Sequence, residues 1–277
     1  MTATERLQVS GLSYEYREET RGQQFCVLDG LSFEVRSAEL FVILGPSGCG
    51  KTTLLNLIAA FIPKQEGQIL IDGVPKMKPG TDCVLVAQEL SLFEWKTALD
   101  NVAFGLKAQA LPRRERIERA LYYLELVKLA ESANKYPQQL SGGMRQRLAL
   151  ARGLAVGPKV MLLDEPFGAL DRLSRREMQD EFLSVHQTTK LTSVLVTHDI
   201  EEAAYLADRL MLLTARPARV ARILPVPLPR LPAAARRIDP DFLAFQHQVW
   251  NNLSSGGDNP ERCQMQVVPA GKGARQF

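Results

Sequence analysis

Short apolar stretches alternate with polar and glycine-containing segments along the first third of the chain. Stretches of this length, bounded by turn-forming residues, are typical of β-strands. One of them is followed by Asp72-Gly73, a dipeptide that favours a tight hairpin turn. The N-terminal third is therefore predicted to be rich in β-structure, with strands at residues 7–16, 27–35, 40–44, 67–71 and 83–87.

The pattern becomes helical between Trp95 and about Arg152. Its most regular part, residues 113–129, is charged and carries apolar residues at helical spacing. A shorter helix is predicted at residues 53–61, directly after the strand at 40–44. The stripe expected to face the core from the 113–129 helix is formed by Ile117, Leu121, Leu124 and Val127 or Lys128.

Two fully apolar strands follow the helical region, at residues 160–163 and 193–196, and a helix at 175–186 separates them. Uninterrupted apolar strands that alternate with helices are typical of a parallel sheet covered on both faces. The chain is therefore expected to belong to the α/β class.

The composition changes beyond Ala215, where proline and arginine alternate. Asp239-Pro240 then predicts the start of a helix, with aspartate as its N-cap and proline at its first position. The remaining residues, from Ser254 to Phe277, are rich in glycine and polar residues and are expected to be disordered. The apolar stripe of the predicted helix consists of Phe242, Phe245, Val249 and Leu253.

Composition excludes several classes of protein. With 277 residues, 45% of them hydrophobic, the chain is long enough to bury a substantial core, and its net charge of +3 is too small to indicate a nucleic-acid partner. Its four cysteines contain no C-x-x-C pair, which suggests a reducing compartment. The N-terminus lacks the apolar core of a secretory signal, and the longest apolar run, residues 54–62, is too short to span a membrane.

The most specific motif is a glycine-rich loop between the predicted strand at 40–44 and the predicted helix at 53–61. Its backbone N–H groups can converge on phosphate oxygens, with a lysine reaching the β- and γ-phosphates and a threonine hydroxyl on Mg²⁺. The motif therefore predicts that the protein binds a nucleoside triphosphate. The loop reads Gly45-Pro46-Ser47-Gly48-Cys49-Gly50-Lys51-Thr52.

Polar residues also end two of the later apolar strands. Asp164 and Glu165 follow the strand at 160–163; Asp164 can support the Mg²⁺ shell and Glu165 can polarise the attacking water. His198 ends the strand at 193–196, where its imidazole can contact a γ-phosphate. The alternatives are a helix N-cap or solvated turn for the acidic pair and a hydrogen-bonded strand-end residue for His198.

A further segment, Ser141-Gly142-Gly143-Met144, begins a helix rich in arginine. The order and spacing of this segment relative to the other motifs make residues 7–231 resemble the ATP-binding subunit of an ABC transporter. The other motifs are the phosphate loop, Gln88, the acidic pair, Ala169-Leu170-Asp171 and His198.

The resemblance implies a P-loop NTPase fold of ABC type. Its sheet core is mixed, with an N-terminal antiparallel β subdomain and a helical subdomain that carries the signature segment. The implied boundaries are 5–235 for the ATP-binding domain, about 89–152 for the helical subdomain, and 236–277 for a C-terminal helix and tail.

The resemblance also assigns roles around ATP and Mg²⁺. Glu165, His198 and Gln88 are the implied catalytic residues, and Thr52, Gln88 and Asp164 are the implied metal ligands. Tyr16 looks like the aromatic residue that stacks on adenine, with Tyr14 as the competing candidate. The implied nucleotide-binding set comprises Tyr16, the phosphate loop with Thr53, and, across a dimer, Ser141, Gly142, Gly143 and Asp171.

Ser141 is expected to cap its helix, so that the two glycines leave bare N–H groups as an anion site. In the family, this segment faces the γ-phosphate held by a second subunit, and a head-to-tail dimer is therefore implied. Met144 departs from the family's glutamine and cannot complete a capping box with Ser141. Cys49 can be interpreted as a redox switch or as a small filler, and we favour the filler.

A narrower resemblance is to importers of taurine, aliphatic sulfonates and nitrate. It is carried by residues 45–59, 100–106, 163–171, 197–203 and 238–242. It implies membrane permease subunits, a periplasmic solute-binding protein as an indirect partner, no nucleic acid, and a peripheral location on the cytoplasmic face of the bacterial inner membrane. Importers of pyrimidine precursors and a soluble ABC ATPase without a permease are the alternatives.

Overall fold

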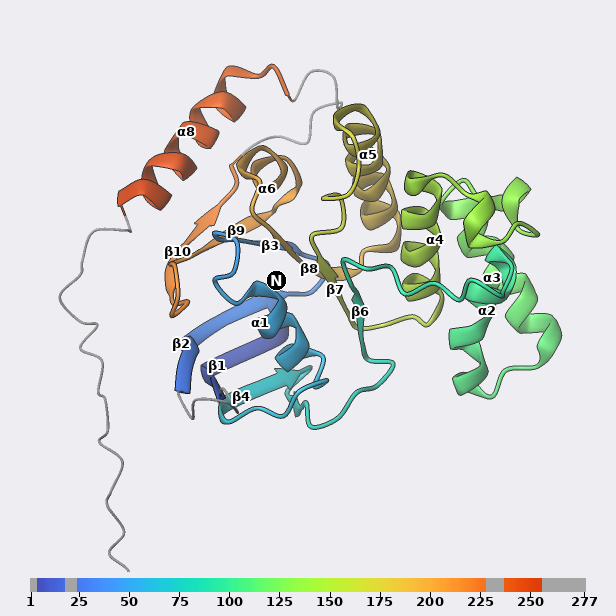
Figure 1. The fold of residues 1–277 in the computed structure, drawn as a ribbon, viewed down its shortest axis with the longest axis horizontal. Helices are drawn as coiled ribbons and strands as arrows, with labels where there is room; N and C mark the ends of the chain where they lie inside the picture. The colour runs from blue at the N-terminus through green and yellow to red at the C-terminus, as the bar shows by residue number, and fades with distance from the viewer. Residues whose placement is uncertain (1–3, 18–23, 228–236, 256–277) are drawn as a thin grey trace, which may run out of the picture.

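A six-stranded sheet forms the centre of the molecule in a computed structural model that describes residues 4–17, 24–227 and 237–255 (Figure 1). Five of its strands are parallel, and the edge strand β10 pairs antiparallel with β9. The sheet order is β10-β9-β3-β8-β7-β6, with β3 at Leu40–Leu44, β6 at Cys83–Val86, β7 at Val160–Asp164, β8 at Thr192–Thr197, β9 at Arg209–Leu213 and β10 at Val220–Pro225.

A four-stranded antiparallel sheet lies beside the central sheet, and helix α1 (Lys51–Ile58) packs between the two (Figure 1). All seven predicted strands are confirmed, and so is the parallel arrangement of the central sheet. Strands β9 and β10 were not predicted. The antiparallel sheet has the order β2-β1-β4-β5, with β1 at Glu5–Arg17, β2 at Gln24–Arg36, β4 at Glu66–Ile71 and β5 at Val74–Pro75.

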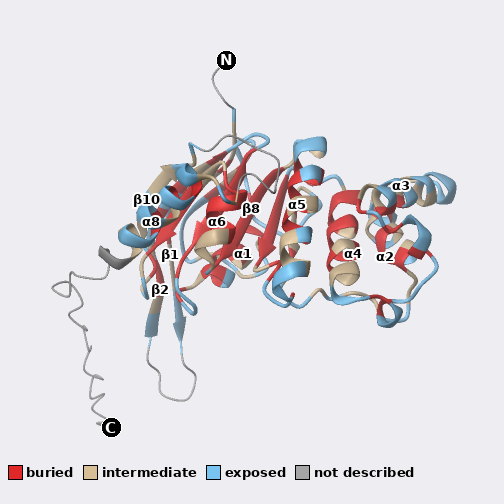
Figure 2. Cartoon of the chain, turned by 90° about the horizontal axis from the view of Figure 1, so that it is seen from above, coloured by how far each residue is buried: buried red, intermediate tan, exposed pale blue. Residues whose placement is uncertain are grey.

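The central sheet is buried on both faces, as its apolar strands require (Figure 2). In β3, Phe41 and Ile43 pack toward α1 and the antiparallel sheet, while Leu40, Val42 and Leu44 pack toward the remaining helices. The alternation along one strand therefore divides the molecule into two hydrophobic cores that share the sheet between them.

Three helices form a lobe at one end of the sheet (Figure 1). They are α2 (Ala98–Leu106), α3 (Arg113–Leu126) and α4 (Gly142–Ala155). Helices α5 (Arg172–Thr189) and α6 (Ile200–Leu206) follow β7 and β8, and α8 (Pro240–Ser255) packs against α6. Short 3₁₀ turns lie at Lys107–Gln109, Ala130–Ser132 and Pro137–Gln139.

Two details of the predicted helices are wrong. Helix α1 ends at Ile58 rather than at residue 61, because the backbone turns into the left-handed region at Ala60, where φ is 59°. In α3 the buried residues are Ala120 and Leu124, followed by Val127, whereas Leu121 is 40% exposed. Leu124 and Val127 are therefore buried as expected, and Ala120 takes the place of Leu121 in the buried stripe.

The start of the C-terminal helix is as predicted. Oδ1 of Asp239 accepts hydrogen bonds from the backbone N–H groups of Asp241 and Phe242, so Asp239 is the N-cap and Pro240 the first residue. The stripe is also confirmed for Phe242, Phe245 and Val249, which are buried, while Leu253 is half-buried. The helix extends two residues into the segment predicted to be disordered, and the rest of that prediction, 256–277, lies outside the described residues.

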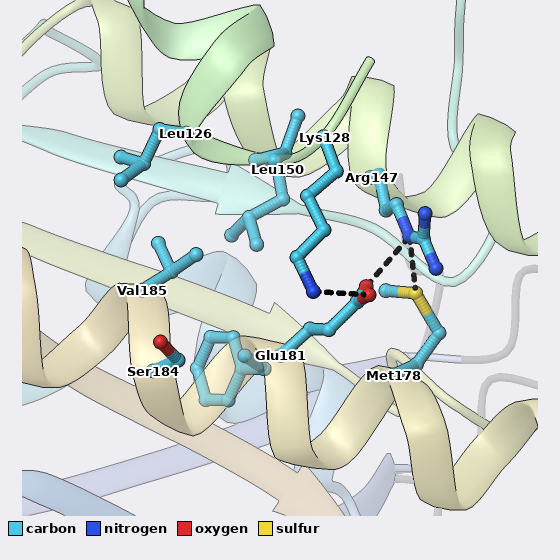
Figure 3. Close-up of a pocket in the computed structure, with 10 residues that line it drawn as sticks. Leu126, Lys128, Arg147, Leu150, Met178, Glu181, Ser184 and Val185 are labelled. Atoms are coloured by element: carbon cyan, nitrogen blue, oxygen red, sulfur yellow. Dashed lines mark hydrogen bonds and ion pairs between the residues drawn. The ribbon is translucent and has the colours of Figure 1, made fainter.

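A shared carboxylate joins the helical lobe to the sheet core (Figure 3). Glu181 on α5 accepts from Lys128 at 3.2 Å and from Arg147 on α4 at 2.7 Å. These charges border a small apolar pocket lined by Leu126, Leu150 and Val185, among other residues. Within the ranges described above, no helix is both long enough and apolar enough to cross a membrane.

Candidate nucleotide site

The register of the parallel strands brings the predicted site residues to one edge of the central sheet. Leu44, which precedes the phosphate loop, is paired with Thr197, and Asp164 is paired with Val196. At the carboxyl ends of these strands, the phosphate loop, the acidic pair and His198 lie side by side. Ligands of open parallel sheets bind at this edge.

The phosphate loop needs glycine at two positions. Gly48 and Gly50 have φ angles of 74° and 117°, which side chains disfavour. A Cβ on Gly50 would also lie 2.7 Å from Cγ1 of Val27 on β2. Lys51 is 5% exposed, and its Nζ donates to the carbonyl oxygens of Gly45 and Pro46 at 2.9 and 3.1 Å. The backbone of the loop therefore curls around the Lys51 ammonium group, as the motif predicts.

Cys49 faces the core rather than the solvent. It is 2% exposed and belongs to the hydrophobic core beneath α1. Burial raises the pKa of the Cys49 thiol, and thiolate chemistry requires the opposite shift. This position supports the interpretation of Cys49 as a filler over that of a redox switch.

Asp164 and Thr52 offer two oxygen ligands to a divalent cation. Asp164 is buried, and desolvation raises the pKa of its carboxyl, against a hydrogen bond from the Thr52 side chain that lowers it. A hydroxyl and a buried carboxylate in contact are the hard oxygen donors that Mg²⁺ prefers, so these residues fit the ion. Gln88 is exposed, and none of the hydrogen bonds within the described residues involves its side chain.

Glu165 lies between two other predicted site residues. Its Oε1 is 3.6 Å from Nζ of Lys51, and its Oε2 is 3.0 Å from Nδ1 of His198. Its backbone φ of 43° is in the left-handed region, an uncommon conformation for a residue with a long side chain. A cation, a carboxylate and an imidazole thus meet beside the phosphate loop.

Tyr16 is the tyrosine that borders the phosphate loop. Its hydroxyl is 3.5 Å from Oγ1 of Thr53 on α1, and the side chain is 46% exposed. Tyr14 is half-buried and meets the ring of Tyr16 edge to face, with centroids 5.0 Å apart. Exposure and placement both favour Tyr16 as the residue available to an adenine ring.

The signature segment forms a separate cavity of about 410 Å³. Oγ of Ser141 accepts from the N–H of Met144 at 3.3 Å, so the predicted N-cap is present without a glutamine. Asp171 lines the same cavity and caps α5 through the N–H groups of Leu173 and Ser174. In the part of the chain that the structure describes, no hydrogen bond or ion pair joins this segment to the phosphate loop.

One residue in contact with the phosphate loop was missed by the sequence analysis. Nη2 of Arg216 donates to the carbonyl oxygen of Gly48 at 2.8 Å. The segment that carries Arg216 is fixed to β2, because Ala218 exchanges backbone hydrogen bonds with Asp29 and Val27. The sequence signal here was a change of composition, which marks a segment without assigning a contact to any of its arginines.

Comparison with known proteins identifies the class. A family profile described as ABC transporter matches residues 28–168. The chain belongs to the ABC transporter family, as an ATP-binding cassette, and the resemblance seen in the sequence is confirmed.

Individual relatives of the chain are ATP-binding proteins of transporters, two of them for taurine import. The taurine import ATP-binding protein TauB of Chromobacterium violaceum is 46% identical over 233 residues, covering 82% of this chain and 89% of that protein. TauB of Escherichia coli O157:H7 is 44% identical over 232 residues, covering 82% and 91%. An uncharacterized ABC transporter ATP-binding protein of Methanocaldococcus jannaschii is 43% identical over 235 residues, covering 85% and 87%.

Solved structures agree on the fold. The dimeric structure of MJ0796, a bacterial ABC transporter cassette, superimposes with a TM-score of 0.70 at 30% identity, covering 79% of this chain and 98% of that one. The same cassette in a post-hydrolysis state bound to ADP and Pi gives a TM-score of 0.69. The predicted fold class is therefore confirmed.

Proposed function

We propose that this chain is the ATP-hydrolysing subunit of an ABC importer and that it powers the uptake of taurine or a related sulfonate. The observation that carries the proposal is the meeting of Lys51, Glu165 and His198 at the mouth of the phosphate loop. The identity to taurine import ATP-binding proteins supports the solute class, with nitrate and pyrimidine precursors as alternatives.

The protein's own residues account for the chemistry as follows. Lys51 and the loop N–H groups hold the β- and γ-phosphates, and Tyr16 stacks on the adenine. Glu165 accepts a proton from the attacking water, while His198, hydrogen-bonded to Glu165, orients that carboxylate. A Mg²⁺ ion held by Thr52, Asp164 and Gln88 would offset the charge that develops on the phosphate oxygens.

A second copy of the chain completes the site in this proposal. Neither Gly142 nor Gly143 has a positive φ, and Cβ atoms there would meet Leu170 and Met178 at the ordinary distances of 3.7 and 4.0 Å. Packing within one chain therefore does not require glycine at these positions. An external ligand that approaches the helix start closely does require it, and the γ-phosphate bound to the other copy is such a ligand.

An apolar groove supports contact with a membrane permease. It is lined by residues of β6, α2, α4 and the loop between β6 and α2, among them Val84, Val86, Phe93, Phe104 and Arg152. The neighbouring Trp95 is 74% exposed. Gln88, an implied metal ligand, follows β6, and β6 lines this groove, so the groove offers the permease a surface coupled to the nucleotide site. The protein would then be bound peripherally to the cytoplasmic face of the inner membrane.

The test of hydrolysis is Glu165→Gln. Loss of a general base is expected to lower turnover by about 10²–10⁴-fold and to leave the Kd for ATP, measured by calorimetry, within a few-fold. Glu118→Gln, at an exposed residue of α3, is the matched control and is expected to hydrolyse at the wild-type rate. Normal hydrolysis by Glu165→Gln would contradict the proposal.

The solute is tested by uptake. The chain is co-expressed with candidate permease and solute-binding subunits in membrane vesicles, and ATP-dependent accumulation of labelled taurine, alkanesulfonates and nitrate is compared. Accumulation of sulfonates, and its loss with Glu165→Gln, is expected. Accumulation of nitrate alone would show that the solute is nitrate rather than a sulfonate, and the assignment of the chain as an importer subunit would stand.

A further inference from the structure

Glu202 is a buried acidic residue that the mechanism above does not use. It lies on α6, four residues after His198, and is 5% exposed. Its Oε2 accepts a hydrogen bond from Oγ1 of Thr197 at 3.1 Å. Its Oε1 is buried without a hydrogen-bond partner among the described residues. Burying a carboxyl oxygen without a hydrogen-bond partner costs free energy, so the surrounding structure must hold Glu202 in this position.

Thr197 links the carboxyl of Glu202 to the residues on both sides of His198. Oγ1 of Thr197 also accepts from the backbone N–H of Asp199 at 3.0 Å, and Oδ1 of Asp199 accepts from the N–H of Glu202 at 3.0 Å. These three hydrogen bonds close a ring around the loop that presents His198. The carboxyl of Glu202 therefore acts on the residue before His198 through the Thr197 hydroxyl, and that hydroxyl holds the backbone N–H of the residue after it.

The same threonine also reaches the phosphate loop. The carbonyl oxygen of Thr197 accepts from the N–H of Gly45, the first residue of that loop, at 3.3 Å. A change in the side chain of Glu202 can thus be passed to the presentation of His198 and to the start of the phosphate loop.

We propose that Glu202 is a positioning residue for hydrolysis: through Thr197 it fixes the loop that holds His198 against Glu165 and the phosphate loop. The proposal rests on the role of His198 given under Proposed function. It adds a residue whose effect on the reaction is transmitted by hydrogen bonds, without contact with the nucleotide.

The electrostatic surroundings agree with a side chain that is uncharged at neutral pH. The pKa of Glu202 is raised to about 8, mainly by burial; the hydrogen bond from Thr197 and the guanidinium of Arg175 act to lower it, and the carboxylates of Asp199 and Glu165 act to raise it. A protonated carboxyl has the shape and hydrogen-bonding groups of a glutamine side chain. Glutamine is therefore the conservative substitution at this position.

The experiment compares Glu202→Leu, Glu202→Gln and Thr197→Val, with Glu201→Gln as the control. Glu201 is the adjacent acidic residue but forms surface ion pairs with Arg176 and Arg237. The kcat and KM for ATP are measured from pH 6 to 9. Glu202→Leu and Thr197→Val are expected to lower kcat about tenfold and to change KM for ATP by no more than about threefold. A general loss of structure would not lower kcat while leaving KM nearly unchanged. Glu202→Gln is expected to retain most of the turnover that Glu202→Leu loses.

The pH profile provides a second readout. Wild-type kcat is expected to fall above about pH 8, where Glu202 ionises, and Glu202→Gln is expected to lack this fall. Wild-type kcat and pH profile in both Glu202→Leu and Thr197→Val would overturn the inference. Circular dichroism identifies a variant that fails to fold, in which case Thr197→Val alone decides.

His198→Ala separates the two proposals. If it lowers kcat while Glu202→Leu and Thr197→Val do not, the inference about Glu202 fails and the role of His198 stands. If His198→Ala hydrolyses at the wild-type rate, the role of His198 is wrong, and the inference that depends on it fails as well.

Discussion

At the scale of single residues, the candidate site depends on contacts between side chains that are far apart in sequence. Lys51, Glu165 and His198 were each predicted from its own motif, and the structure adds that Glu165 contacts the other two. The sequence could not predict Arg216 or Glu202 in the same way. Both act through hydrogen bonds to backbone or hydroxyl groups, and such bonds leave no motif.

The contact of Arg216 with the phosphate loop predicts an effect on ATP binding. Arg216→Ala removes the hydrogen bond to the Gly48 carbonyl, which is worth about 0.5–1.5 kcal/mol, so the Kd for ATP is expected to rise about 2- to 10-fold. Calorimetry measures the change. Arg219→Ala, on the same segment but paired with Asp29, removes the same charge and is expected to bind ATP as the wild type does. Equal effects of the two substitutions would refute the loop contact as the cause.

The buried carboxyl of Glu202 predicts how stability depends on pH. Its pKa is about 8 in the folded chain and near 4.5 in the unfolded one, so the folded state holds this proton more tightly. Its contribution to stability is therefore fully present below pH 4.5 and is lost as the pH rises toward 8. Urea unfolding at several pH values is expected to show a loss in the wild type that Glu202→Gln lacks. Parallel curves for the two proteins would contradict this prediction.

At the scale of elements, apolar runs bounded by turn residues were sufficient to predict the strands that hold the site. The prediction failed at one position of α3, where Ala120 rather than Leu121 faces the core. That helix has apolar side chains on more than one face, among them Tyr122, so spacing alone could not select the buried side. Strand β10 was missed because it is an edge strand that contains Arg222 and ends in Pro225.

Two glycines of helix α4 give a test of the signature segment. Gly143→Ala has room for its methyl group and improves helix propensity, so it is expected to raise the free energy of unfolding by up to about 1 kcal/mol while reducing hydrolysis at least tenfold. Gly153→Ala places its Cβ 3.0 Å from Cε of buried Met161 and is expected to lower stability with kcat preserved. Urea unfolding and ATPase assays on both variants measure the pattern, and normal hydrolysis by Gly143→Ala would exclude a close ligand at this position.

At the scale of the whole molecule, we propose that one chain contains two half-sites. The phosphate loop with Glu165 lies at the edge of the sheet, while the segment from Ser141 to Met144 lines a cavity of its own with Asp171. The lobe that carries Ser141 is joined to the core through Glu181, which contacts Lys128 and Arg147. We therefore assign a complete nucleotide site to two copies of the chain, related head to tail.

The most direct test of this central claim is the mass of Glu165→Gln in solution, measured by sedimentation velocity with Mg·ATP. We expect a dimer with ATP and a monomer without it, because Glu165→Gln hydrolyses too slowly the nucleotide that joins the two copies. Adding Ser141→Arg to Glu165→Gln is predicted to keep the chain monomeric with ATP bound, since the arginine blocks the partner's phosphate. A Glu165→Gln protein that binds ATP and stays monomeric, or a double variant that dimerises as readily, would contradict the account.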